Sequence, residues 1–207
     1  GVSAAPAPAT AKGLLVTRTE RPVLFQDLGR HGHADQGVGD SGALDRTALV
    51  EANRCLGNPQ GAAALEICLG GFALHTDRPI TIAVTGAPTP LAVRAADGRK
   101  YWAPFARPFA LEAGDELALE APSAGTRSYL ALRGGFRTDS VLGSASTDTL
   151  GKIGPPPVVQ GTVLEPADQS AAPLDPLASA PRRLPKVGET VTLDVVLGPR
   201  TDWFTAR

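Results

Sequence analysis

The densest run of polar side chains spans residues 25–45, and its glycine-rich part, residues 27–45, is here named the polar loop. Its glycines let the backbone turn sharply or approach a ligand closely. The loop and the residue before it supply hydrogen-bond donors, acceptors and charge, from Gln26, Asp27, Arg30, His31, His33, Asp35 and Asp45. Loops that gather such groups on a rigid β scaffold often form functional sites. The same residues also fit a solvated turn in which Asp27 merely pairs with Arg30. The residue types alone favour neither interpretation.

A second group is the hydroxyl turn, residues 143–149, with the sequence Gly-Ser-Ala-Ser-Thr-Asp-Thr. Hydroxyl and backbone N–H groups both donate hydrogen bonds, so Ser144, Ser146 and Thr147 would suit a phosphate, a carboxylate or a ureido group. An ordinary Ser/Thr turn is the commoner reason for such a sequence. If both segments serve one site, they must converge in space on the wall of a β domain.

His31 and His33 form a His-x-His pair close to Asp35. On a regular strand this spacing would place both imidazoles on one face, as some metal sites require. The surrounding glycines argue against a regular strand. We therefore predict polar structural histidines and no metal site.

The clearest element that could position these groups is a helix over residues 45–56. Apolar residues recur there at helical spacing and form one stripe. Asp45 suits the N-cap, and Gly57 followed by Pro59 suits the end of the helix. A second short helix at 60–64 is an open alternative.

The rest of the fold is predicted to be mainly strands. Asp97-Gly98 favours a tight hairpin, because this pair tolerates positive φ. Many short strands with one good helix indicate a β-barrel or a sandwich rather than βαβ units. The predicted strands are 14–19, 65–69, 80–85, 91–94, 105–111, 116–120, 127–132 and 190–197.

Composition excludes several classes of partner. The chain has 207 residues with 20 basic and 21 acidic side chains, which gives no basic surface for a nucleic acid or an anionic membrane. No apolar run approaches the roughly 20 residues of a membrane span. The two cysteines are not in Cys-x-x-Cys spacing and suit small core side chains in a reducing cytoplasm.

The usual signatures of several catalytic classes are missing from the sequence. It contains no phosphate-binding GxxxxGK[ST] loop, no Rossmann glycine motif in a βαβ unit and no GxSxG elbow. It also contains no Met, so it cannot carry a Met-Lys-Met biotinylation site. Biotin would therefore have to arrive on another protein.

Composition also divides the chain. Residues 1–12 alternate Ala and Pro and are predicted to be a flexible tail, followed by one β domain over 13–164. Residues 165–189 are rich in Pro, Ala and Ser and are predicted to be an irregular loop. Residues 190–207 would begin a second unit.

Several motifs occur in a fixed order, namely FQDLGRHG, GVGDSGALDRTALVEANRCLGN, AALEICLGG, VTGA, AGDELAL, SYLALRGGF and VLGSASTDTL. As a set they resemble the carboxyltransferase A/B family. That family includes allophanate hydrolase subunit 2-like proteins, the C subunit of 5-oxoprolinase, the kinase-inhibitor antagonist of sporulating bacteria and the carboxyltransferase part of urea carboxylase.

The resemblance implies a cyclophilin-like β-barrel, two such units in a full-length member, and a C/D-type partner chain whose junction lies near the active site. Family members usually continue for about one more domain, so we expect this sequence to lack the C-terminal half of the family pattern. The implied catalytic residues are Asp27, Arg30 and Asp45. The implied substrate-binding residues are Gln26, Asn53, Ser144, Ser146 and Thr147.

The implied function is that of an enzyme subunit in a hetero-oligomer. Such a subunit is not expected to be active without its partner chains. Its substrate would be a small urea-like or lactam molecule. The reaction would be either ATP-dependent opening of 5-oxoproline or biotin-dependent carboxyl transfer, with ATP or carboxybiotin supplied through the complex and not bound by this chain itself. The alternative is a non-catalytic regulatory subunit that binds and antagonises an inhibitor protein.

Overall fold

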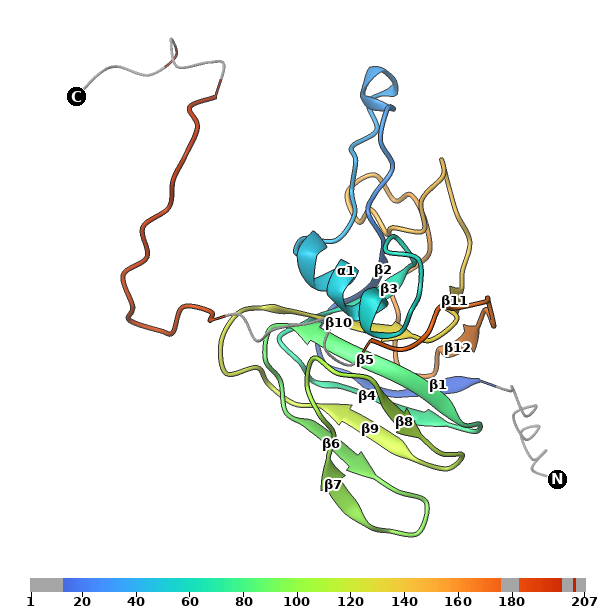
Figure 1. The fold of residues 1–207 in the computed structure, drawn as a ribbon. Coiled ribbons are helices and arrows are strands. Elements are labelled where there is room, and N and C mark those ends of the chain that lie inside the picture. Colours follow the sequence, from blue (N-terminus) through green and yellow to red (C-terminus); the bar gives the residue numbers. More distant parts are fainter. Residues whose placement is uncertain (1–12, 176–182, 199–202, 204–207) are drawn as a thin grey trace, which may run out of the picture.

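A computed structural model describes residues 13–175, 183–198 and 203, and its described residues are mainly β (Figure 1). The helices are η1 (Ala34–Gln36), a single 3-10 turn, and α1 (Arg46–Cys55). The strands are β1 (Leu14–Thr19), β2 (Val23–Gln26), β3 (Ala64–Cys68), β4 (Phe72–Thr76), β5 (Ile80–Gly86), β6 (Leu91–Arg94), β7 (Lys100–Trp102), β8 (Phe109–Leu111), β9 (Glu116–Leu119), β10 (Arg127–Leu132), β11 (Phe136–Arg137) and β12 (Val163–Pro166). The predicted fold class, mainly β with one clear helix, is confirmed.

The strands build two antiparallel sheets. One has seven strands in the order β11-β12-β1-β4-β9-β6-β7, and the other has five in the order β2-β3-β10-β5-β8. Among the described residues no strand pairing joins the two sheets, so the predicted barrel takes the form of two open sheets. The cyclophilin-like description stays a prediction.

The main core lies between the two sheets, because alternate side chains of each strand point to opposite faces. On β3, Leu65 and Ile67 belong to this core and are fully buried. Glu66 lies between them in sequence and therefore points to the other face of the five-stranded sheet.

Helix α1 covers that other face. Ala48, Leu49, Ala52 and Cys55 form its buried stripe, which joins Tyr129 and Ala131 of β10 in a second apolar cluster. Asp45 caps the helix, since its side chain accepts a hydrogen bond of 3.0 Å from the Ala48 amide. This confirms the predicted helix and its cap.

Four local predictions differ from the structure. Residues 60–64 form a turn and the start of β3, not a second helix. The strand predicted at 105–111 is limited to β8, because Ala106 adopts a left-handed φ of 57° that interrupts extended chain. The segment 190–197 forms no strand, since none of the described strands pairs with it. Strand β12 extends two residues past the predicted boundary at 164.

The tail predicted at 1–12 lies outside the described residues, as do residues 176–182 of the predicted irregular loop. Residues 167–175 of that loop are irregular. Among the described parts of the chain, no helix has the length and apolar character needed to span a membrane.

The polar loop projects away from the sheets, and the segment that contains the hydroxyl turn lies beside it at the same end of the molecule (Figure 1). This end carries the groups that the sequence singled out.

Candidate functional site

Asp27 joins the polar loop to the hydroxyl turn. Its carboxylate accepts hydrogen bonds from the hydroxyls of Ser144 and Ser146, both at 2.6 Å, and from the amides of Ala145 and Gly29, both at 2.7 Å. These residues are more than 110 positions apart in sequence, apart from Gly29. The predicted convergence of the two segments is therefore confirmed.

The ionisation of Asp27 follows from these contacts. Burial disfavours the carboxylate, but the hydrogen bonds from Ser144 and Ser146, and then those from the two amides, outweigh it. The net result is a pKa below the ordinary value of 3.8. Asp27 is thus a stable anion at neutral pH and a weak proton acceptor.

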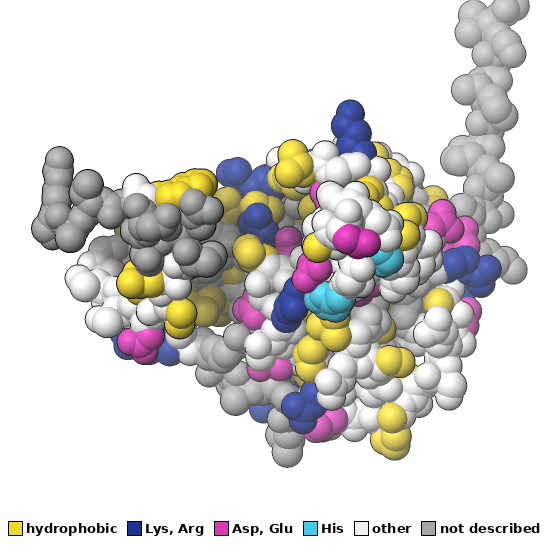
Figure 2. Space-filling view, turned by 90° about the horizontal axis from the view of Figure 1, so that it is seen from above, with side chains coloured by type: hydrophobic (Ala, Val, Ile, Leu, Met, Phe, Trp, Pro, Cys, Tyr) yellow, Lys and Arg dark blue, Asp and Glu magenta, His cyan; other side chains and the backbone are white. Residues whose placement is uncertain are grey.

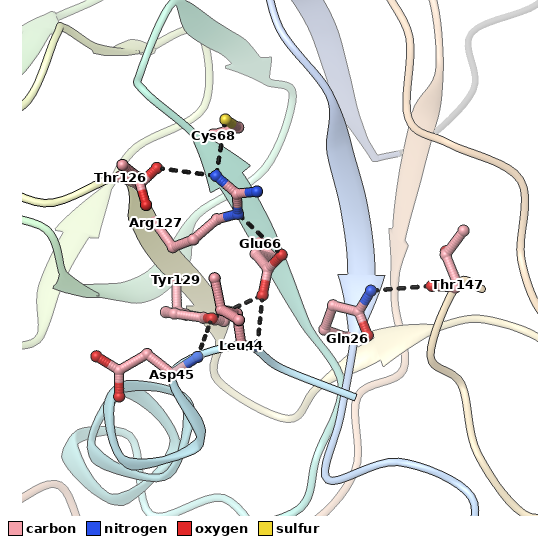
Figure 3. A network of polar contacts seen from close by, with 9 residues as sticks. All are labelled: Gln26, Leu44, Asp45, Glu66, Cys68, Thr126, Arg127, Tyr129 and Thr147. Atoms are coloured by element: carbon pink, nitrogen blue, oxygen red, sulfur yellow. Dashed lines mark hydrogen bonds and ion pairs between the residues drawn. The ribbon is translucent and has the colours of Figure 1, made fainter. Parts of the chain in front are cut away.

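Gln26 and Thr147 continue the same junction. The Gln26 side-chain amide donates to the carbonyl of Thr147 at 3.0 Å, as Figure 3 shows, and the Thr147 amide donates to the carbonyl of Phe25 at 2.8 Å. The Thr147 hydroxyl donates to the carbonyl of Pro155 at 2.9 Å. The Gln26 side-chain oxygen is buried and has no partner among the described residues.

The hydroxyl turn consequently has few free donors. The three hydroxyls of Ser144, Ser146 and Thr147 are all occupied, and the backbone amides of residues 144–147 all bind groups of this chain. Ser144, Ser146 and Thr147 are all buried. In this structure the turn holds two loops together and does not present a cradle for a phosphate or a ureido group.

Arg30 is only 1% exposed. Its guanidinium donates to the carbonyl of Ser146, and at 3.4 Å to the carbonyl of Val141. It forms no ion pair among the described residues, so the predicted alternative of an Asp27–Arg30 pair is wrong. One amino group, Nη1, is buried without a hydrogen-bond partner. A buried charge with no carboxylate at ion-pair distance is costly and points to a use beyond packing.

Asp45 directly precedes α1 and Asn53 lies within it, and both side chains have other surroundings. Asp45 caps the helix, and its amide donates to the hydroxyl of Tyr129 at 2.7 Å. Asn53 is fully buried, and its side-chain amide donates to the carbonyl of Ala62 at 2.7 Å and accepts from Asn58 at 3.1 Å. Both positions organise the helix and its following loop, and their predicted roles toward a substrate stay predictions.

Glu66 centres a buried network that the sequence reasoning missed (Figure 3). Its carboxylate accepts from the hydroxyl of Tyr129 at 2.6 Å, the amide of Leu44 at 3.0 Å and the guanidinium of Arg127 at 3.2 Å. Burial, followed by the hydrogen bond to Glu66, raises the pKa of Tyr129. The sequence signal that could have indicated this network is the acidic residue within the otherwise apolar run Ala-Leu-Glu-Ile-Cys. The network fixes the C-terminal end of the polar loop on the sheet.

The exposed part of the polar loop carries the histidines. His31 Nδ1 lies 3.0 Å from Asp40 Oδ2, and both side chains are more than half exposed. Figure 2, which looks down on this end, shows histidine and acidic side chains side by side. Among the described residues no group of three or more potential metal ligands occurs.

A cavity of about 400 Å³ opens beside the junction, formed by residues 147–149 and 152–157. Asp148 and Lys152 are its charged lining residues. The Asp148 carboxylate accepts from the hydroxyl of Ser41 at 3.1 Å, so the polar loop contacts the cavity wall. Lys152 forms no ion pair with any described residue. We name this space the Lys152 cavity.

The carboxyltransferase domain family, subdomain A and B, matches residues 36–207. The chain belongs to this family. It is 36% identical over 156 residues to the C subunit of 5-oxoprolinase from Escherichia coli strain K12, a match that covers 75% of this chain and 48% of that protein. It is 35% identical over 126 residues to urea amidolyase of Saccharomyces cerevisiae, covering 61% of this chain and 7% of that protein.

The fold of this carboxyltransferase-family chain also matches a solved structure. The crystal structure of Kluyveromyces lactis urea carboxylase aligns with a TM-score of 0.73 and 28% identity, over 82% of this chain and 16% of that one. The chain thus spans about half the length of the 5-oxoprolinase protein it matches, 48%, and a small part of the urea enzymes.

Proposed function

We propose that this chain is a subunit of a multi-chain enzyme that acts on a small lactam or urea-like substrate together with a C/D-type partner in the cytoplasm. Family membership and the names of the relatives support this. ATP-dependent ring opening of 5-oxoproline is the first candidate, because the relative from E. coli is a separate subunit that this chain matches over 75% of its own length. Biotin-dependent carboxyl transfer is the second, supported by the urea carboxylase match.

The buried charge of Arg30, which has no carboxylate at ion-pair distance in the described part of the chain, carries the proposal. Its guanidinium lies directly behind the Lys152 cavity, since a Cβ placed on the cavity residue Gly154 would lie 3.1 Å from Arg30 Nη2. A fixed positive charge in a poorly solvated position stabilises negative charge that develops nearby during reaction. Both candidate reactions develop such charge, on a phosphorylated lactam or on a ureido group.

Asp27 acts as a positioning residue in this proposal. Four donors occupy its carboxylate, and its pKa is lowered, so it is poorly suited to take a proton from the substrate. It holds Ser146, whose carbonyl in turn accepts from Arg30. ATP or carboxybiotin would be held mainly by the partner chains, because the hydroxyl turn has its donors occupied.

The test uses the full-length natural chain assembled with its partner subunits. ATP-dependent loss of 5-oxoproline and carboxylation of urea are measured separately. Arg30→Ala should lower the active reaction by about 100-fold while the complex still assembles, with Arg30→Lys retaining part of the rate. Arg137→Ala is the matched control and should leave the rate unchanged. Arg137 lies on β11 and forms an exposed ion pair with Glu165 of β12.

An intact complex that is inactive on both substrates would reject the enzymatic proposal. A complex that assembles, is inactive and relieves inhibition by a partner protein would instead support the regulatory function.

A further inference from the structure

We infer that the Lys152 cavity is the subsite for a small lactam acid, that is, a ring with an amide N–H and a free carboxylate. The inference rests on the proposed function and deepens it, since it separates a charged lactam from uncharged urea as the substrate. Its basis is the shape of the cavity, the two positive charges of Lys152 and Arg30 around it, and the carboxylate of Asp148 that lines it.

Backbone and side-chain hydrogen bonds close the loop that presents Lys152. The backbones of Asp148 and Ile153 exchange two hydrogen bonds, of 2.8 and 3.2 Å. The Asp148 carboxylate accepts from the amides of Leu150 and Gly151 at 2.9 and 2.7 Å. Within this loop Lys152 has a φ of 54°, a left-handed conformation that is unfavourable for residues other than glycine. The fold therefore maintains a strained backbone at the residue that carries the free charge.

The size and walls of the cavity suit a small ring. Its volume of about 400 Å³ lies within the range of small-molecule sites. Pro155, Pro156 and Pro157 supply rigid apolar surface along one wall, against which a saturated ring can pack. Thr147 and Asp148 stand among the polar residues that line the same space.

The charges around the cavity match a carboxylate. Lys152 lines it with an ammonium group that has no ion-pair partner among the described residues. Arg30 adds a second positive charge behind the wall, and its hydrogen bonds within the described residues go to the carbonyl oxygens of Val141 and Ser146. Asp148 is the acid among the lining residues. Because a carboxylate prefers a cation that lacks another partner, Lys152 is the residue we assign to bind it.

Asp148 matches the other end of the ligand. Its Oδ1 atom accepts hydrogen bonds from two backbone amides. Among the described residues Oδ2 accepts one hydrogen bond, from the Ser41 hydroxyl, and keeps capacity for another donor. A lactam N–H can supply that donor while its carboxylate binds Lys152. Urea lacks the carboxylate, and so it can use only one of the two positions.

Binding is measured on the assembled complex of the full-length chain without nucleotide, by calorimetry. The probes are 5-oxoproline, 2-pyrrolidinone, which is the same ring without the carboxylate, and urea. We expect 5-oxoproline to bind at least about tenfold more tightly than either neutral probe. Lys152→Gln should remove this preference and Lys152→Arg should retain it. Lys100→Gln, on the distant strand β7, is the control and should bind like the unaltered chain.

Equal affinity for the two lactams, no binding of 5-oxoproline, or an unchanged preference in Lys152→Gln would each overturn the inference. Turnover is measured in parallel to keep the two proposals apart. If Lys152→Gln consumes 5-oxoproline at the normal rate and affinity, the subsite is wrong while the proposed function stands. If the unaltered complex turns over neither substrate, the proposed function fails and the binding data alone decide the subsite.

Discussion

Four hydrogen bonds converge on the single carboxylate of Asp27, so replacing this side chain affects a junction between two loops. Asp27→Asn removes the charge and puts an NH2 group where an oxygen accepted hydrogen bonds. Since hydrogen bonds to charged groups are stronger than neutral ones, we expect the free energy of unfolding to fall by about 2–4 kcal/mol. Urea denaturation monitored by fluorescence measures this change.

Asp139→Asn is the matched control for that substitution, because it is the same chemical change at an exposed position. It should change the free energy of unfolding by less than about 0.5 kcal/mol. A similar small effect for both variants would show that Asp27 does not stabilise the junction.

Helix α1 and the five-stranded sheet are connected at the helix start by Tyr129, whose hydroxyl accepts from the Asp45 amide and donates to Glu66. Tyr129→Phe leaves both buried groups with one partner fewer. The free energy of unfolding should fall by about 1–3 kcal/mol in denaturant titrations. The control Tyr101→Phe on β7 should change the free energy of unfolding little, because Tyr101 is 41% exposed.

The loop that follows the hydroxyl turn depends on Gly154. This residue has a φ of 89°, and a Cβ there would collide with the carbonyl oxygen of Ser146. Gly154→Ala should therefore displace the cavity wall and Arg30, with a loss of stability of about 2–4 kcal/mol and a loss of 5-oxoproline binding.

Gly161→Ala separates steric from conformational causes. Gly161 has the same φ of 89°, but a Cβ there would meet nothing within 4 Å. Gly161→Ala should lower the free energy of unfolding by only about 1 kcal/mol, because alanine is strained in the left-handed backbone conformation. Equal destabilisation of the two variants would mean that the contact with Ser146 is unimportant.

The stability of the whole molecule should depend on acid through Asp27. Its pKa in the folded chain lies below the ordinary value of 3.8, so the unfolded chain binds the proton more tightly. The stabilisation by Asp27 is fully present above that ordinary value and is lost as the pH falls through the folded pKa. Urea denaturation from pH 7 to pH 3 should show that the free energies of unfolding of the unaltered chain and of Asp27→Asn approach each other only at the acidic end of this range. A constant difference would contradict this.

Local patterns were sufficient for much of the architecture. The stripe and cap of α1, the alternation of strands such as β10, and the turn at Asp97-Gly98 are properties of neighbouring residues, and the structure contains each of them. The order of motifs also singled out Asp27, Ser144 and Ser146. Periodicity and turn chemistry act over a few residues, and for that reason the sequence alone determines them.

Tertiary structure decided which partners those residues take. Asp27 binds serines more than 115 positions away. Arg30, three residues along the chain, is buried and has no carboxylate at ion-pair distance among the residues that the structure describes. Tertiary structure also placed Lys152, which has no ion-pair partner within the described ranges, beside the same junction, and it left the two sheets open. Such pairings depend on which loops emerge at the same end of the packed sheets, and this is set by long-range strand pairing and burial, not by local sequence.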